Sequence, residues 1–166
     1  MASQAGLTRA SGDNPLRASQ VMNTIWVVVA DSSHARCFHT VSPIGTLKEK
    51  WDITHEASRL AERALTTDRP DRTFDSVGGG RHAMEEPTGV HEATVRAFAR
   101  EIAGRLDSAR QRHAFERLYL IAAPDFLGHL REALSDSCRA LLIDSIDKNV
   151  VKQDLQAIRA HLPERL

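Results

Sequence analysis

The chain has 166 residues, of which 42% are hydrophobic and 27% charged, and this length and composition fit one globular domain with a real core. Its 22 lysines and arginines balance 22 aspartates and glutamates, so a large basic face is excluded and any binding of nucleic acid must be local. No apolar run approaches about 18 residues, which excludes a membrane-spanning helix.

The first 22 residues are polar and rich in Ala, Ser, Gly and Arg, without the apolar stretch of a secretory signal. We expect residues 1–22 to form a disordered tail and residues 23–166 to form a single α/β domain. The two cysteines, Cys37 and Cys138, lie among apolar residues, as buried and reduced thiols do. These features predict a cytoplasmic protein.

Three short strands are predicted at the start of the domain. Residues 24–30 form a β-branched run that ends at Asp31, which is typical of a buried central strand. Residues 34–41 begin with alternating side chains, and residues 46–55 follow turn-forming residues at 42–45. Because the connections are too short for crossover helices, the three strands should form an antiparallel meander.

Helices and strands alternate in the rest of the chain. The elements expected there are helices at 57–65 and 90–112, a strand at 117–123, a helix at 126–134, a strand at 141–147 and a helix at 152–162. Right-handed crossovers would place the fourth and fifth strands parallel to the first. The predicted fold is therefore one mixed five-stranded sheet with helices on its faces, in ribonuclease-H-like order.

A glycine-rich segment, about 66–89, separates the first two predicted helices and shows no periodic pattern, as binding loops often do. Glycine lets the backbone approach a ligand closely, while arginine and histidine offer charge and hydrogen-bond donors to an anion. The candidate binding residues are Arg69, Arg72, Gly78, Gly79, Gly80, Arg81 and His82. Interleaved acidic residues leave ion pairing within the segment as the alternative.

A second candidate site is acidic. Asp31 and Asp125 each follow a strand, and the two strands should be parallel neighbours, so the carboxylates could meet at one sheet edge. A nuclease with two metal ions uses such acids, although acids at strand ends also serve turns and helix caps. The eight histidines include no pair with convincing metal-binding spacing, so we predict no metal or cofactor.

Several short motifs are specific in their order and combination. They are Trp26-Val-Val-Val-Ala-Asp-Ser-Ser33, Ala35-Arg36, Asp68-Arg-Pro-Asp-Arg72, Phe74-Asp75-Ser76, Gly80-Arg81-His82-Ala83, His91-Glu92, Phe98-Ala99, and Ala123-Pro124 with Leu127-Gly128. Together they resemble the bacterial family called protein required for attachment to host cells. The resemblance covers about residues 24–162. It implies a fold similar to the middle domain of archaeo-eukaryotic peptide-chain release factors, whose Gly-Gly-Gln loop enters the ribosomal peptidyl-transferase centre.

This chain has Gly78-Gly79-Gly80-Arg81 at the matching place and no glutamine, which argues against hydrolysis of peptidyl-tRNA. The resemblance therefore implies a non-catalytic binding module that contacts ribosomal or transfer RNA through the glycine-rich segment. One alternative is an interaction module with a protein partner, linked to bacterial attachment. Another is a metal-dependent nuclease that uses Asp31 and Asp125.

Overall fold

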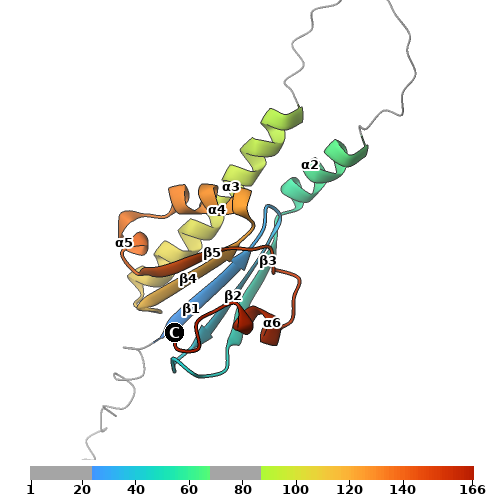
Figure 1. Ribbon diagram of the computed structural model, residues 1–166. Coiled ribbons are helices and arrows are strands. Elements are labelled where there is room, and N and C mark those ends of the chain that lie inside the picture. The colour runs from blue at the N-terminus through green and yellow to red at the C-terminus, as the bar shows by residue number, and fades with distance from the viewer. Residues whose placement is uncertain (1–23, 68–86) are drawn as a thin grey trace, which may run out of the picture.

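The computed structural model describes residues 24–67 and 87–166 (Figure 1). Its sheet has five strands in the order β3-β2-β1-β4-β5. Their bounds are Ile25–Ala30 for β1, His34–Thr40 for β2, Lys48–Thr54 for β3, Arg117–Ala122 for β4 and Leu142–Asp147 for β5. The predicted N-terminal tail and most of the glycine-rich segment lie outside the described residues.

The sheet is mixed, as the sequence predicts. β1 pairs antiparallel with β2, and β2 pairs antiparallel with β3, which gives the expected meander. On the other side, β1 pairs parallel with β4, and β4 pairs parallel with β5. The carboxyl ends of β1, β4 and β5 consequently lie at the same edge of the sheet.

Five helices accompany the sheet in the described part of the chain. They are α2 at Glu56–Thr67, α3 at Pro87–Gln111, α4 at Pro124–Ala133, α5 at Asp136–Arg139 and α6 at Leu155–Ala160. The short helix α5 was not predicted; Ser135 caps it by accepting a hydrogen bond from the backbone N–H of Cys138. None of these helices combines the length and apolar character needed to cross a bilayer.

The side chains of α2 differ from expectation. Helical spacing in the sequence predicts an apolar side with Leu60, Ala61 and Ala64, but Leu60 is 60% exposed and Ala64 is also exposed. The buried residue is instead Ser58, whose hydroxyl lies 2.7 Å from Nδ1 of His55. The ring of His55 stacks on Phe98 of α3, and this ring contact joins the start of the helix to the core.

The core lies on both faces of β1, all six residues of which are buried. Trp26 and Val28 face a cluster built with α3 and α4, whereas Val27 and Val29 face the C-terminal segment around α6. The arrangement in Figure 1 agrees, with α3 and α4 on one face and α6 on the other. This explains why an unbroken β-branched run occupies the strand.

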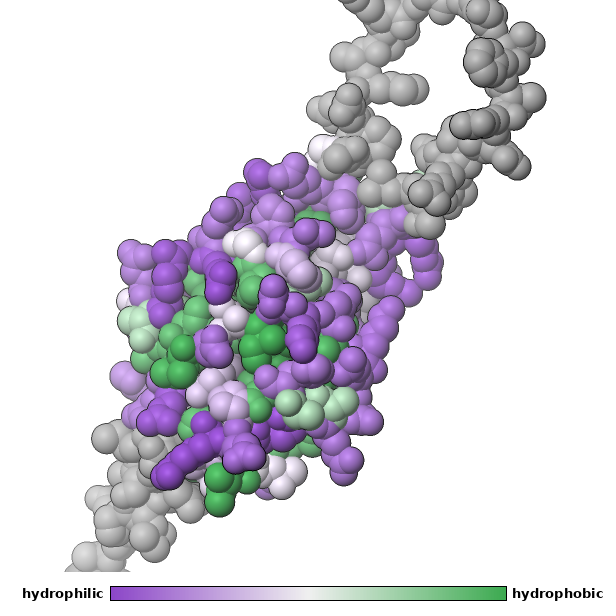
Figure 2. Space-filling model, in the orientation of Figure 1, coloured by the Kyte–Doolittle hydropathy of each residue, from purple (hydrophilic) through white to green (hydrophobic). Residues whose placement is uncertain are grey.

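The sequence places four aromatic residues on periodic apolar faces, which predicts that they belong to the core. This is confirmed, since Trp26, Phe98, Tyr119 and Phe126 are all buried. Trp51, whose packing the sequence left open, is half-buried against the cluster that contains Trp26. The two cysteine thiols are free and buried, as expected. Hydrophilic side chains cover most of the face drawn in Figure 2, with apolar patches between them.

Candidate functional site

A cavity of about 530 Å³ opens at the carboxyl edge of the parallel strands. Open α/β sheets commonly bind ligands at this edge, because the chain leaves neighbouring strands in different directions and opens a crevice. Its walls come from the turn after β1, from α2, α3 and α4, and from the segment after β5. The lining residues are Asp31, Ser32, Ser33, Glu62, His91, Glu92, Val95, Ala123, Asp125, Phe126, His129, Asn149 and Lys152.

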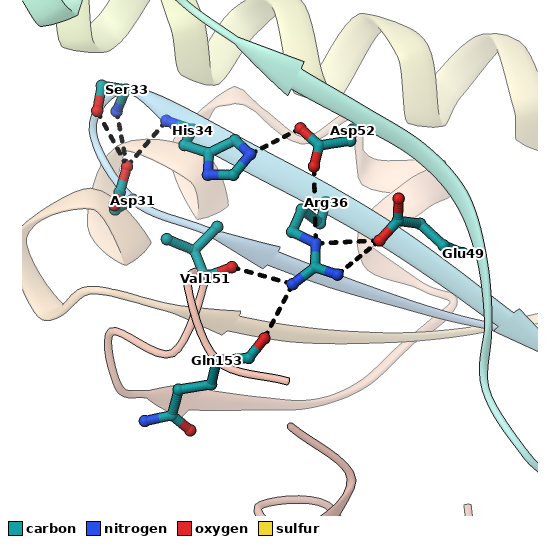
Figure 3. Close-up of polar contacts among 8 residues, drawn as sticks. All are labelled: Asp31, Ser33, His34, Arg36, Glu49, Asp52, Val151 and Gln153. Carbon is teal, nitrogen blue, oxygen red and sulfur yellow. Dashed lines mark hydrogen bonds and ion pairs between the residues drawn. The ribbon is translucent and has the colours of Figure 1, made fainter. Parts of the chain in front are cut away.

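Asp31 has a structural task in this cavity. Its Oδ1 accepts hydrogen bonds from the backbone N–H groups of Ser33, at 2.9 Å, and His34, at 2.8 Å (Figure 3). These bonds close the turn between β1 and β2. An aspartate at the end of a strand often has this structural role. Oδ2 accepts no hydrogen bond from the described residues and is left for another partner.

Asp125 lies in the first turn of α4, which begins at Pro124 and has no side-chain cap. Its side chain is exposed and has no hydrogen-bond or ion-pair partner among the described residues. The structure therefore places Asp31 and Asp125 in one cavity, at the sheet edge where we expected them. A shared role for the two carboxylates stays a prediction.

The sequence analysis did not identify the other polar groups of this cavity as parts of one site. The hydroxyl of Ser32 donates to Oε1 of Glu62, which joins the first turn of the meander to α2. Nδ1 of His91 is buried and has no hydrogen-bond partner in the part of the chain that the structure describes. His129 from α4 and Lys152 from the segment after β5 complete the polar wall. These residues come from separate elements, so no local pattern connects them.

The residues at 24–67 and 87–166 contain no group of three or more His, Cys, Asp or Glu side chains that could hold a metal ion. The sequence offers Glu49, Asp75 and Asp144 as further acids for such a site. Glu49 instead pairs with Arg36, Asp144 lies exposed on β5, and Asp75 lies outside the described residues. The described acids therefore do not gather into the cluster that a two-metal nuclease requires.

Arg36 anchors the segment that forms one wall of the cavity. Its guanidinium donates to the carbonyl oxygens of Val151, at 3.2 Å, and Gln153, at 2.9 Å, and also binds Glu49 (Figure 3). Lys152, between these two carbonyl groups in sequence, lines the cavity. Strand β2 of the meander thereby holds the chain that follows β5.

A second depression, of about 590 Å³, lies between β3 and α3. Half-buried Trp51 lines it, and Lys50 lies over the ring of Trp26 with Nζ 5.2 Å from the ring centroid. Arg105 and Arg112 of α3 add two cations, of which Arg105 pairs with Glu101 at 3.0 Å. We call this surface the β3–α3 groove. It combines an aromatic ring with an excess of positive charge.

The seven predicted binding residues of the glycine-rich segment, Arg69, Arg72, Gly78, Gly79, Gly80, Arg81 and His82, lie outside the described residues. The structure therefore adds nothing to that prediction.

Comparison with known proteins identifies the family. A family model described as "Protein required for attachment to host cells" matches residues 26–162, which is most of the chain. The chain belongs to this family. The match runs from β1 to just beyond α6 and so includes every strand of the sheet. No match is found among curated proteins.

Archaeal proteins are among the solved structures that this chain resembles. The archaeal translation termination factor aRF1 matches with a TM-score of 0.50 and 8% sequence identity, over 90% of this chain and 39% of that one. An archaeal protein matches with a TM-score of 0.45 and 10% identity, over 82% of this chain and 32% of that one. This family member thus spans about two-fifths of the termination factor and shares the fold of that part.

Proposed function

We propose that this family member is a non-catalytic binding module that contacts ribosomal or transfer RNA. The likeness of its fold to part of a translation termination factor directs the proposal toward the ribosome. The sequence supplies a contact region in the glycine-rich segment, where Arg69, Arg72, Arg81 and His82 would meet phosphate groups.

The observation that carries the proposal is the β3–α3 groove. Lysine and arginine side chains contact RNA phosphates, while an accessible aromatic ring stacks on unpaired bases. Lys50, Trp51 and Arg112 offer this combination side by side, and Arg112 has no ion-pair partner among the described residues. Such a local basic surface suits a chain whose net charge is zero.

Equilibrium binding of fluorescently labelled transfer RNA, measured at several salt concentrations, tests this proposal. Each contact between a cation and phosphate in a single strand contributes about 0.7 to the slope of log affinity against log salt concentration. Lys50→Gln and Arg112→Gln should each lower the affinity and reduce the slope by about that amount. The control is Arg165→Gln, which removes the same charge from an exposed residue outside the groove. It should change neither the affinity nor the slope.

The glycine-rich segment is tested in the same assay. Arg81→Ala and His82→Ala should weaken RNA binding, whereas the Arg165 control should not. Wild-type protein that binds neither transfer RNA nor ribosomes at low salt would contradict the proposal.

Two alternatives predict different results. An interaction module linked to attachment, as the family description suggests, would bind a protein partner without the steep salt dependence of RNA binding. A nuclease using Asp31 and Asp125 would cleave RNA only with a divalent ion, and Asp125→Asn would abolish the cleavage. The shared cavity of the two carboxylates is the one feature that fits this second alternative, while the described acids form no group that could hold a metal ion.

A further inference from the structure

The cavity at the carboxyl edge is separate from the β3–α3 groove and has the opposite charge. Among the described residues, four carboxylates line it, from Asp31, Glu62, Glu92 and Asp125, together with the ammonium group of Lys152. Glu92 also pairs with Arg96 of α3 at 2.5 Å, so the four acids exceed these two cations by two negative charges. The four acids come from different parts of the fold, because only Asp31 belongs to the turn after β1 and each other acid belongs to its own helix. A concave wall with this excess of negative charge concentrates cations and repels phosphate.

Unused polar atoms remain inside the cavity. Oδ2 of Asp31 and the carboxylate of Asp125 accept no hydrogen bond from the described residues. Nδ1 of His91 also has no partner among these residues, but it is buried and a ligand in the cavity does not reach it. Hydrogen bonds to charged groups contribute about 1.5–3 kcal/mol, so a ligand that donates to the two carboxylates is favoured.

The remaining wall is apolar. Val95 of α3 and Phe126 of α4 are buried side chains that line the cavity, together with Ala123 before α4. A volume of about 530 Å³ falls within the range of about 300–1,000 Å³ typical of small-molecule sites. The cavity therefore has room for a compound with a compact apolar body and several N–H donors.

We propose that this cavity binds a small organic cation, a compound that joins an amine, amidine or guanidine group to an apolar portion. The cationic group donates to the carboxylate of Asp125 and to Oδ2 of Asp31. The apolar portion packs against Val95 and Phe126. The inference does not depend on contact with RNA, and either proposal can fail alone.

Three ring compounds of the same shape test the charge requirement: benzamidine is cationic, benzamide is neutral and benzoate is anionic. Binding to the full-length protein is followed by two-dimensional amide NMR, which reports both affinity and location. Benzamidine should bind saturably and shift amide signals of the residues after β1 and at the start of α4. Benzamide should bind at least about tenfold more weakly, because hydrogen bonds between charged partners are about twice as strong as neutral ones. Benzoate should not bind.

Matched variants test the assignment of residues. Asp125→Asn should weaken benzamidine binding about three- to tenfold, as expected for loss of one charge-assisted hydrogen bond at a partly exposed site. Asp136→Asn makes the same change in the first turn of α5, outside the cavity, and should leave the affinity unchanged. Lys152→Gln removes the opposing cation and should strengthen binding.

Several results would overturn the inference. These are equal binding of benzamide and benzamidine, signal shifts confined to the β3–α3 groove, or no saturable binding of benzamidine below about 10 mM. Weaker benzamidine binding by the Lys152→Gln variant would also contradict the charge argument. Asp31 is left unchanged in these experiments because its carboxylate closes the turn after β1.

Discussion

Replacement of Arg36 by methionine should destabilise the protein far more than replacement of an ordinary surface arginine. The Arg36 side chain is only 19% exposed, and its guanidinium donates to two main-chain carbonyl groups as well as to Glu49. It also lies over the ring of Phe38, with Cζ 4.9 Å from the centroid. Methionine keeps the apolar stem and removes every donor.

The magnitude follows from these contacts. Each hydrogen bond to a main-chain carbonyl contributes about 1 kcal/mol, and the contact with Phe38 adds about 0.5 kcal/mol. The pair with Glu49 adds at most about 1 kcal/mol, because the glutamate side chain is 43% exposed. The free energy of unfolding should therefore fall by about 2–3.5 kcal/mol in the Arg36→Met variant.

Urea unfolding followed by circular dichroism measures this change. Arg105→Met is the matched control, because Arg105 makes only the exposed helical pair with Glu101, and it should cost at most about 0.5 kcal/mol. Glu49→Gln should cost less than about 1 kcal/mol. A loss below about 1 kcal/mol for Arg36→Met, or an equal loss for Glu49→Gln, would show that the carbonyl contacts do not hold the segment after β5.

Three further predictions concern titrating groups. Burial raises the pKa of the Cys37 thiol, so a thiol-specific reagent at pH 8 should label Cys37 only after unfolding in urea; rapid labelling of the native protein would contradict its burial. Burial, and then the charge of Lys50, lowers the pKa of His39 below 6.5 in the folded chain. The unfolded chain then binds the extra proton, so stability should fall as pH drops through about 6.5, and His39→Gln should lessen that fall in urea titrations at pH 7.5 and 5.5. A hydrogen bond from Ser135, and then one from Arg110, lowers the pKa of Asp107 below 3.8. This stabilisation is present above about pH 4 and is lost as pH falls through the folded pKa, so Asp107→Asn should flatten the acid limb of a plot of Tm against pH.

Much of the fold follows from local sequence patterns. The β-branched run of β1 predicted a strand buried on both faces, and the helical spacing of Val95, Phe98 and Ile102 predicted the buried side of α3. The short connections between the first three strands predicted their antiparallel pairing. The right-handedness of crossovers predicted that β4 and β5 run parallel to β1. These patterns are local, so they could be found without the structure.

The parts that escaped prediction depend on tertiary contacts. Helical spacing places Leu60 on the predicted apolar side of α2. In the structure the buried residue of this helix is Ser58, which contacts His55, and Leu60 is exposed. The four-residue helix α5 is too short to show a period.

The cavity illustrates the same limit. The rule that parallel strands end at one edge located Asp31 and Asp125, whereas nothing local links them to Glu62, His91 or Lys152. The β3–α3 groove depends likewise on the docking of α3 beside Trp51.

Co-sedimentation with ribosomes tests the central claim most directly. Wild-type protein and a variant carrying Gly79→Ala, Arg81→Ala and His82→Ala would be centrifuged with purified ribosomes at low and moderate salt. We expect the wild type to pellet with ribosomes in a salt-sensitive way and the variant to stay in the supernatant. Wild-type protein that remains in the supernatant at low salt would contradict it.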